Sequence, residues 1–393
     1  MEHEHIGQSQ HLPPITTLVF GASPPVFFKL FQQPFSFHQY LNSLFSCLLV
    51  VMATPTSNSP VSTTSSSPTA SCTTAVPNKY GYVHPEACNA QWSYDPSFPA
   101  AVTFATLFGL LTIAHVGLAV FHRKGFSWVM IMGVGWELIA FVIRAIATRN
   151  QQSQTLAIIS TLFFLLAPLW VNAYAYMTAG RLIWTYHPDK KVWGFKAISI
   201  GKWFVWFDIA SFLVQATGGS MLSPGNDAST MTSGKNIYMA GVGVQQGFII
   251  LFTALIVRFQ LDVQRLYTQN KRWLWLTFAL YASLILISIR IIFRLVEFSA
   301  GVEISNPLPY NEVYALILDA FPMTLAILVL AVVHPGLALK GPESEFPSRK
   351  ERKAEKKRVK AEKKAAKQNK KKGFRREDTF EPLHGEYEMN SRA

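Results

Sequence analysis

Long apolar runs alternate with short polar loops along most of the chain. Each run holds about 20 mainly apolar residues, which is the length that an α-helix needs to cross a bilayer. The runs are continuous and do not alternate in period two, so they do not fit a transmembrane β-barrel. The pattern therefore predicts an all-α, polytopic membrane protein with seven spans: Phe98–Phe121, Trp128–Thr148, Leu156–Gly180, Trp203–Leu222, Ile237–Val257, Trp273–Phe298 and Val313–Val333.

Composition supports this prediction and divides the chain into four parts. Half of the 393 residues are hydrophobic and 15% are charged, against about 25% charged residues in soluble domains. The predicted parts are a doubtful leader (1–52), a Ser/Thr/Pro-rich segment (53–96), the seven-span domain (97–339) and a basic tail (340–393).

Lys and Arg residues in the short loops predict the orientation. With seven spans the two termini lie on opposite sides of the membrane. One side carries eleven basic residues and the other carries three, Lys79, Arg149 and Lys235. Basic loops stay in the cytosol, so we expect the N-terminus outside and the C-terminus in the cytosol. The eleven are Arg123, Lys124, Arg181, Lys190, Lys191, Lys196, Lys202, Arg258, Arg265, Lys271 and Arg272.

The segment before the first span has no core-forming composition. Residues 54–77 contain 14 Ser/Thr and four Pro, a mixture that stays extended. It fits an O-glycosylated stalk and an undecorated linker equally well. The apolar run Leu44–Ala53 is too short to span, and one hypothesis is that translation begins at Met52. Cys72 and Cys88 would lie outside, either as a disulfide or as two free thiols.

The tail concentrates the positive charge. Residues 340–393 hold 18 basic against 10 acidic residues, and Arg349–Lys372 is rich in helix formers with almost no apolar stripe. Such a helix would bind the anionic inner leaflet, where each basic residue adds about 1 kcal/mol, or would be a solvated trafficking tail. It lacks the interleaved aromatic residues of a nucleic-acid binder, so nucleic acid is not an expected partner.

Ionisable residues inside the spans are the candidate functional groups, because each costs at least about 2.5 kcal/mol at the centre of a span. Helical spacing puts Glu137 and Arg144 on one face, and Asp208 and Gln215 on one face. We expect a polar cavity open to the outer side, with carboxylates at its base. Substrate or proton binding is assigned to Glu137, Asp208, Asp319, Gln215 and Gln245, and structural charge pairing to Arg144, Arg290, Arg294, Glu297 and Glu312.

Several functional classes lack their motifs. The chain has no G-x-x-x-x-G-K-[ST] phosphate loop, no G-x-S-x-G nucleophile elbow and no His/Cys cluster with zinc-ligand spacing. The last span has no lysine that could carry retinal. The sequence therefore predicts no ATP motor, no enzyme, no metal site and no cofactor.

The ordered motifs resemble the fungal RTA-like family, also called the lipid-translocating exporter family. They extend from about Tyr80 to Gly336 and are YGYVHPEACNAQW, GLLTIAHVG, GWELIAFVIR, LLAPLWVNAYAYMTAGRLI, FVWFDIASFLVQATGGS, SIRIIFRLVEFSAG, EVYALILDAFPM and HPG. The chain departs from the family where three glycines often occur, since Ser220 follows Gly218 and Gly219. The intramembrane acids of the family would fall on Glu137, Asp208, Glu297, Glu312 and Asp319.

The resemblance implies a plasma-membrane protein that moves amphipathic lipids such as sphingoid long-chain bases and gives resistance to lipophilic toxins. We expect membrane lipids as its partners. A receptor or sensor that acts on lipid asymmetry indirectly is the alternative, because seven spans with an outside N-terminus and a cytosolic tail fit signalling as well. Transport by the purified protein would separate the two hypotheses.

Overall fold

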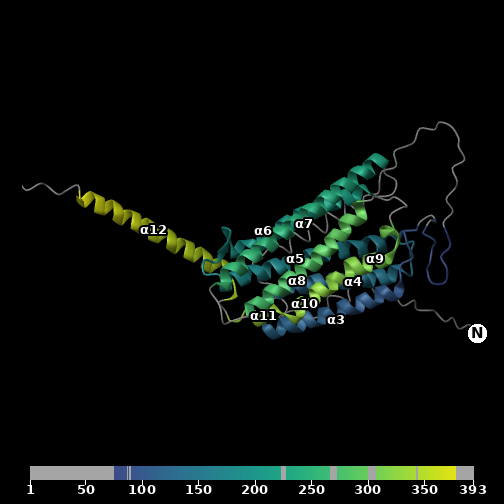
Figure 1. Cartoon of the computed structure of the whole chain (residues 1–393), viewed down its shortest axis with the longest axis horizontal. Coiled ribbons are helices and arrows are strands. Elements are labelled where there is room, and N and C mark those ends of the chain that lie inside the picture. The colour runs from purple at the N-terminus through teal and green to yellow at the C-terminus, as the bar shows by residue number, and fades with distance from the viewer. Residues whose placement is uncertain are drawn as a thin grey trace, which may run out of the picture. The chain divides into compact units, whose positions relative to one another are not determined.

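The computed structural model describes residues 75–85, 87, 90–222, 227–265, 272–299, 307–341 and 344–377. Seven apolar helical segments lie side by side in one bundle (Figure 1). The protein is thus an all-α, multi-pass membrane protein, as predicted. Six of the segments are single helices: α3 (Phe98–His122), α4 (Trp128–Ala147), α5 (Gln154–Tyr186), α6 (Ala197–Met221), α7 (Ala228–Gln264) and α8 (Arg272–Ser299).

The seventh segment is built from four pieces. It comprises α9 (Glu312–Ala315), the π-helical turn η4 (Leu316–Ala320), α10 (Phe321–Val332) and α11 (Pro335–Ala338). The smaller elements are the 3-10 turns η2 (Gly125–Ser127) and η3 (Leu308–Tyr310), and the hairpin of β1 (Lys191–Val192) and β2 (Phe195–Lys196). Helix α12 (Arg349–Glu377) belongs to a separate unit that begins at Glu345.

Local sequence signals set several helix starts. Ser97 caps α3 by accepting from the amide of Ala100 at 3.4 Å, and Ser153 caps α5 by accepting from Leu156 at 3.5 Å. Asn311 caps α9 by accepting from Val313 at 3.1 Å. These are the short polar side chains that satisfy the unpaired amides of a first helical turn. The observed α5 and α7 extend beyond the predicted apolar runs at both ends.

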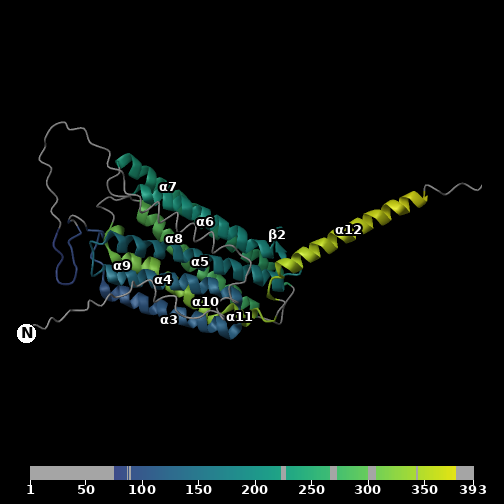
Figure 2. The ribbon, with the colours of Figure 1, turned by 180° about the vertical axis from the view of Figure 1, so that it is seen from behind.

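Helix α5 lies in the middle of the bundle, and Figure 2 shows the other helices on both sides of it. From Leu166 to Ile183 nearly every residue is buried, whatever its angle around the helix. A helix that is apolar on all sides is a buried helix. By contrast, α3 is peripheral, since Ile113 and Phe121 are 71% and 80% exposed to the surroundings.

Two glycines let α6 and α7 pack with their backbones almost touching. A Cβ added to Gly218 would lie 2.4 Å from the amide nitrogen of Tyr238, and one added to Gly241 would lie 3.0 Å from that of Gln215. Small residues at such crossings are a usual means of helix association in membranes. This close contact brings the polar side chains of α6 and α7 together.

We call the two ends of the bundle the Ser97 end and the His334 end. The Ser97 end is where α3, α5 and α7 begin, and where α4, α6 and α8 finish. The His334 end is the opposite one. The prediction that the N-terminus lies outside concerns the membrane itself and stays a prediction.

Candidate functional site

The π-helical turn carries Asp319 into the centre of a buried charge cluster. Its carboxylate is fully buried, with one oxygen paired to Nε of Arg290 and the other to Nη2 of Arg294. Both arginines come from α8, one helical turn apart. Single π-helical turns are frequent at functional sites because they redirect one side chain within a helix.

Two further acids complete this cluster. Glu297 accepts a 3.0 Å hydrogen bond from Arg294 through Oε2, and Glu137 Oε1 lies 3.9 Å from Nη1 of Arg290. Arg290 also donates to the backbone carbonyl of Phe164 at 3.2 Å, which ties α8 to α5. The interior charge cluster, defined as Glu137, Arg290, Arg294, Glu297 and Asp319, therefore joins α4, α8 and the seventh segment.

The interior charge cluster contains three carboxyl groups and two guanidinium groups. Glu137 is the carboxyl group with the weakest contacts. It is 0% exposed, and neither of its oxygens has a hydrogen-bond partner among the described residues. A buried carboxylate without hydrogen bonds is costly unless it binds a proton or a cation. The geometry thus makes Glu137 the group of the cluster best suited to take up a positive charge.

Asp208 forms a separate polar site between α5 and α6. Its Oδ2 accepts from the amide of Asn172 and from the hydroxyl of Tyr176, both at 2.9 Å. The residue is 2% exposed, and Oδ1 has no hydrogen-bond partner in the part of the chain that the structure describes. One oxygen is therefore held in place while the other keeps its capacity to bind.

The two predicted glutamines meet across the α6–α7 contact. Gln215 donates to Oε1 of Gln245 at 2.9 Å. Both line a small cavity of about 40 Å³. Asn172, Arg290 and Arg294 also line it. This cavity thus lies between the Asp208 site and the interior charge cluster.

A second ion pair lies at the Ser97 end. Arg144 of α4 and Glu312 of α9 are paired at 2.7 Å. Arg144 also donates to the hydroxyl of Tyr94 at 2.7 Å, and Glu312 accepts from the amide of Ser97 at 2.6 Å. The guanidinium carbon lies 4.8 Å from the ring centre of Trp92, within the range of a cation–π contact. The pair therefore joins the segment before α3 to α4 and α9.

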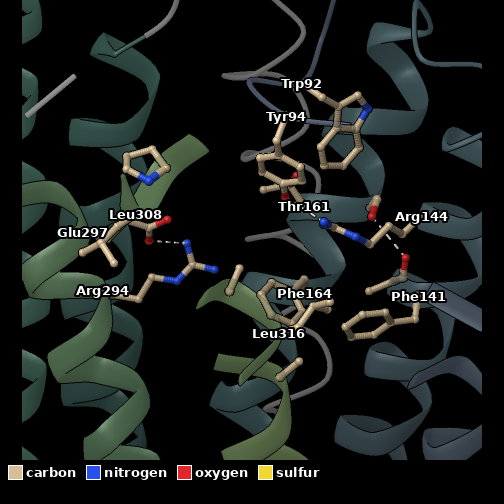
Figure 3. A pocket seen from close by; sticks show the side chains of 15 residues that line it. Trp92, Tyr94, Phe141, Arg144, Thr161, Phe164, Arg294, Glu297, Leu308 and Leu316 are labelled. Atoms are coloured by element: carbon tan, nitrogen blue, oxygen red, sulfur yellow. Dashed lines mark hydrogen bonds and ion pairs between the residues drawn. The ribbon is translucent and has the colours of Figure 1, made fainter. Parts of the chain in front are cut away.

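A larger cavity, of about 130 Å³, lies beside this pair, and we call it the two-arginine cavity. Figure 3 shows Arg294 and Arg144 reaching it from opposite sides, with Tyr94 and Trp92 above and Phe164 below. The charged residues of its lining, in the part of the chain that the structure describes, are these two arginines and Glu297. The described residues that line it are Trp92, Tyr94, Ala140, Phe141, Arg144, Ser160, Thr161, Phe164, Arg294, Glu297, Leu308, Pro309, Ala315, Leu316 and Ala320.

The five residues assigned to substrate or proton binding fall into three groups. Glu137 and Asp319 are in the interior charge cluster, Asp208 forms its own site, and Gln215 and Gln245 form the pair between them. Each arginine assigned to charge pairing has an acidic neighbour: Arg144 has Glu312, Arg290 has Asp319, and Arg294 has both Glu297 and Asp319. The carboxylates of Glu137 and Asp319 do not line the two-arginine cavity.

Sequence reasoning missed four polar or aromatic partners. Asn172 and Tyr176 donate hydrogen bonds to Asp208. The sequence feature that could have identified them is a side-chain amide in the middle of an apolar run, with a tyrosine one helical turn further on. Trp92 and Tyr94 contact Arg144 from a segment that precedes the first span. Two aromatic residues just before a span indicate a contact at that end of the bundle, but the sequence does not identify the arginine that they contact.

A histidine group lies at the His334 end. The rings of His122 and His334 stack with centres 4.7 Å apart, and Nε2 of His334 is 3.4 Å from the hydroxyl of Ser127. Lys124 donates to Ser344 at 2.9 Å. His115, deeper in the bundle, contacts the carbonyl of Ile327 at 3.2 Å. These contacts join α3 to the seventh segment.

Among the described residues no group of three His, Cys, Asp or Glu has a metal-binding arrangement.

Two predicted features lie outside the described residues. Cys72 and Cys88 are not described, so the disulfide stays a prediction, as does the doubtful leader. The part of the Ser/Thr/Pro-rich segment before Ala75 is also not described.

Comparison with known proteins points to one family. The model of the RTA1-like proteins matches residues 130–342. A probable lipid transporter, atnI, of Emericella nidulans is 42% identical over 307 residues, covering 74% of this chain and 80% of that protein.

Two yeast proteins are more distant relatives. Protoporphyrin uptake protein 1 of Saccharomyces cerevisiae is 30% identical, over 50% of this chain and 64% of its own. The sphingoid long-chain base transporter RSB1 of the same species is 24% identical, over 64% of this chain and 75% of its own. No solved structure matches the chain. The extent of the family match and the 42% identity show that this chain belongs to the RTA1-like protein family.

Proposed function

We propose that this protein translocates amphipathic lipids across a membrane and does so without catalysis. The observation that carries the proposal is the interior charge cluster, in which three carboxyl groups face two guanidinium groups inside a seven-span bundle. Ionisable groups inside a membrane bundle usually serve a substrate or proton path. The relatives are named lipid, sphingoid long-chain base and protoporphyrin transport proteins, which supports the same function.

A sphingoid long-chain base is the first substrate to test. Its ammonium group would be matched by the carboxyl group of Glu137 or by Oδ1 of Asp208, which has no hydrogen-bond partner among the described residues. Its apolar tail would stay between helices or in lipid. A proton and the ammonium group of the lipid would compete for the same carboxylate, Glu137 or Asp208. Each carboxylate would therefore be either protonated or bound to the ammonium group. This scheme couples lipid movement to protons and requires no ATP.

The decisive experiment measures flipping of a fluorescent sphingoid base by the purified protein in liposomes. The wild type is compared with Glu137→Gln, Asp208→Asn and a matched control, Asp262→Asn. Asp262 is a carboxylate paired with Arg258 at 3.0 Å near the end of α7, away from both sites. We expect flipping by the wild type and the control, and at least a tenfold loss in the other two variants.

The same liposomes test the receptor hypothesis and the coupling. A folded protein that flips no lipid without cellular partners would favour the receptor or sensor. A pH gradient across the liposomes should change the wild-type rate, and the Glu137→Gln variant should not respond to it.

The basic tail supports the proposed orientation and a contact with the anionic inner leaflet. Along α12 the spacing puts Lys353, Lys360 and Lys367 in line, seven residues apart, with further lysines beside them. The acids Glu355 and Glu362 lie on the other side, where Arg358 pairs with them at 3.3 and 3.4 Å. One face of α12 is therefore uniformly basic. Protease protection of tags at each terminus in sealed plasma-membrane vesicles tests both the N-outside orientation and the location.

A further inference from the structure

The two-arginine cavity presents positive charge to whatever enters it. Arg144 and Arg294 line it from opposite sides (Figure 3), and Glu297 is the one acid among the described residues of its lining. Glu297 already accepts the 3.0 Å hydrogen bond of Arg294. The other acids that neutralise these arginines, Glu312 and Asp319, are outside the lining. An ammonium group in the cavity would therefore meet two guanidinium groups, whereas an anion would complement them.

Arg294 also keeps an unused donor. Its Nη1 and Nη2 contact Glu297 and Asp319, but its buried Nε has no hydrogen-bond partner among the described residues. A buried unpaired N–H is costly, and more so on a charged group. A ligand with acceptor oxygens would satisfy it. Arginine is well suited to carboxylate and phosphate oxygens because its donors form a planar fork.

The size of the cavity limits what fits inside. A cavity of about 150 Å³ holds one benzene ring, so a cavity of about 130 Å³ holds a headgroup but not an alkyl chain. The apolar side chains of Phe141, Phe164 and Leu316 line the part of the cavity that is lower in Figure 3, where the first carbons of a chain would pack. Thr161, which also lines the cavity, is exposed on the surface of the bundle, so a chain could continue outward there.

We propose that the two-arginine cavity binds the anionic headgroup, phosphate or carboxylate, of a single-chain amphiphile. This proposal adds acidic amphiphiles to the lipids that the protein is proposed to translocate. Its meaning for transport rests on the proposed function. The protein can bind such an amphiphile without transporting it, so the binding proposal and the transport proposal can each be wrong while the other holds.

The test measures binding to the purified full-length protein in nanodiscs of neutral lipid. Three probes are compared: dodecyl phosphate, dodecylammonium and inorganic phosphate. Dodecyl phosphate should bind saturably and at least tenfold more tightly than either of the other two. Equal binding of dodecylammonium would overturn the charge argument, and equal binding of inorganic phosphate would overturn the assignment to an amphiphile.

A cavity-filling variant locates the site. Ala140 is 2% exposed and lines the cavity, so the ring of Ala140→Phe would occupy most of it. Ala210→Phe makes the same change on the exposed face of α6. Dodecyl phosphate binding should fall at least tenfold in Ala140→Phe and stay unchanged in Ala210→Phe. Wild-type binding by a folded Ala140→Phe protein would contradict the location. Failure of lipid flipping with this binding pattern intact would count against the proposed function alone.

Discussion

The amide of Asn172 donates a 2.9 Å hydrogen bond to the carboxylate of Asp208 inside the bundle. Asn172 lies on the central helix α5 and Asp208 on α6, so the bond joins two spans as well as orienting the carboxylate. Tyr176, one turn beyond Asn172, donates to the same oxygen at 2.9 Å. Asp208 therefore combines a fixed position with one oxygen that has no hydrogen-bond partner among the described residues.

Removing the hydroxyl of Tyr176 should weaken this arrangement without disturbing the ring packing. Tyr176→Phe keeps the edge contact with Phe252, at 4.5 Å between ring centres, but loses a hydrogen bond to a carboxylate. We expect a loss of about 1.5–3 kcal/mol in unfolding free energy and a slower flipping rate. Tyr281→Phe is the matched control, because Tyr281 donates to the neutral Gln260 at 2.9 Å in a partly buried place. Thermal unfolding in detergent should show a smaller shift for the control, and equal shifts would contradict the prediction.

Neutralising Asp319 should destabilise the fold more than neutralising Glu137. Asp319→Asn removes the carboxylate that pairs with both Arg290 and Arg294, and it leaves Arg290 with the more distant Glu137, at 3.9 Å. Breaking a buried pair costs about 3–5 kcal/mol. Glu137→Gln removes a carboxyl group whose oxygens have no hydrogen-bond partners among the described residues, so it should cost less than about 1 kcal/mol. Comparison of the thermal unfolding midpoints of the two variants checks the order. A Glu137→Gln protein less stable than Asp319→Asn would show that the ranking is wrong.

The sequence predicted the seven spans well because the length of an apolar run is a local property. It also identified the interior acids and arginines, since a charge in an apolar run is visible without knowing its neighbours. The partners of these charges depend on which helices touch. Nothing in the sequence places Asp319 of the last span between two arginines of the sixth, because that contact follows from the packing of the bundle and from the π-helical turn at Leu316–Ala320.

The two-arginine cavity was even less accessible to sequence reasoning. The expected cavity had carboxylates at its base, whereas the lining found here carries Arg144 and Arg294, with Trp92 and Tyr94 from the segment before α3. That segment has few apolar residues and no helical period, so periodicity could not place it on the bundle. Its position depends on single contacts such as the hydrogen bond from Arg144 to Tyr94.

Adding a methyl group to Gly218 should separate α6 from α7. The added Cβ would lie 2.4 Å from the backbone nitrogen of Tyr238, which cannot move aside as a side chain could. Gly219 is the matched control, because a Cβ there meets nothing within 4 Å. Gly219→Ala should be neutral or gain up to about 1 kcal/mol from helix propensity, whereas Gly218→Ala should lower the unfolding midpoint. A Gly218→Ala protein as stable as Gly219→Ala would contradict the close packing.

Removing the carboxylate of Glu312 should release the segment before α3. Glu312 binds Arg144 at 2.7 Å and accepts from the Ser97 amide at 2.6 Å, so Glu312→Ala breaks both links at once. We expect faster hydrogen exchange at the first turn of α3 and in the segment that holds Trp92, because their amides lose a fixed neighbour. Asn311→Ala is the control: it removes the 3.1 Å cap of α9 but leaves Glu312 in place, so exchange at Ser97 should stay slow. Unchanged exchange in Glu312→Ala would show that other contacts hold the segment.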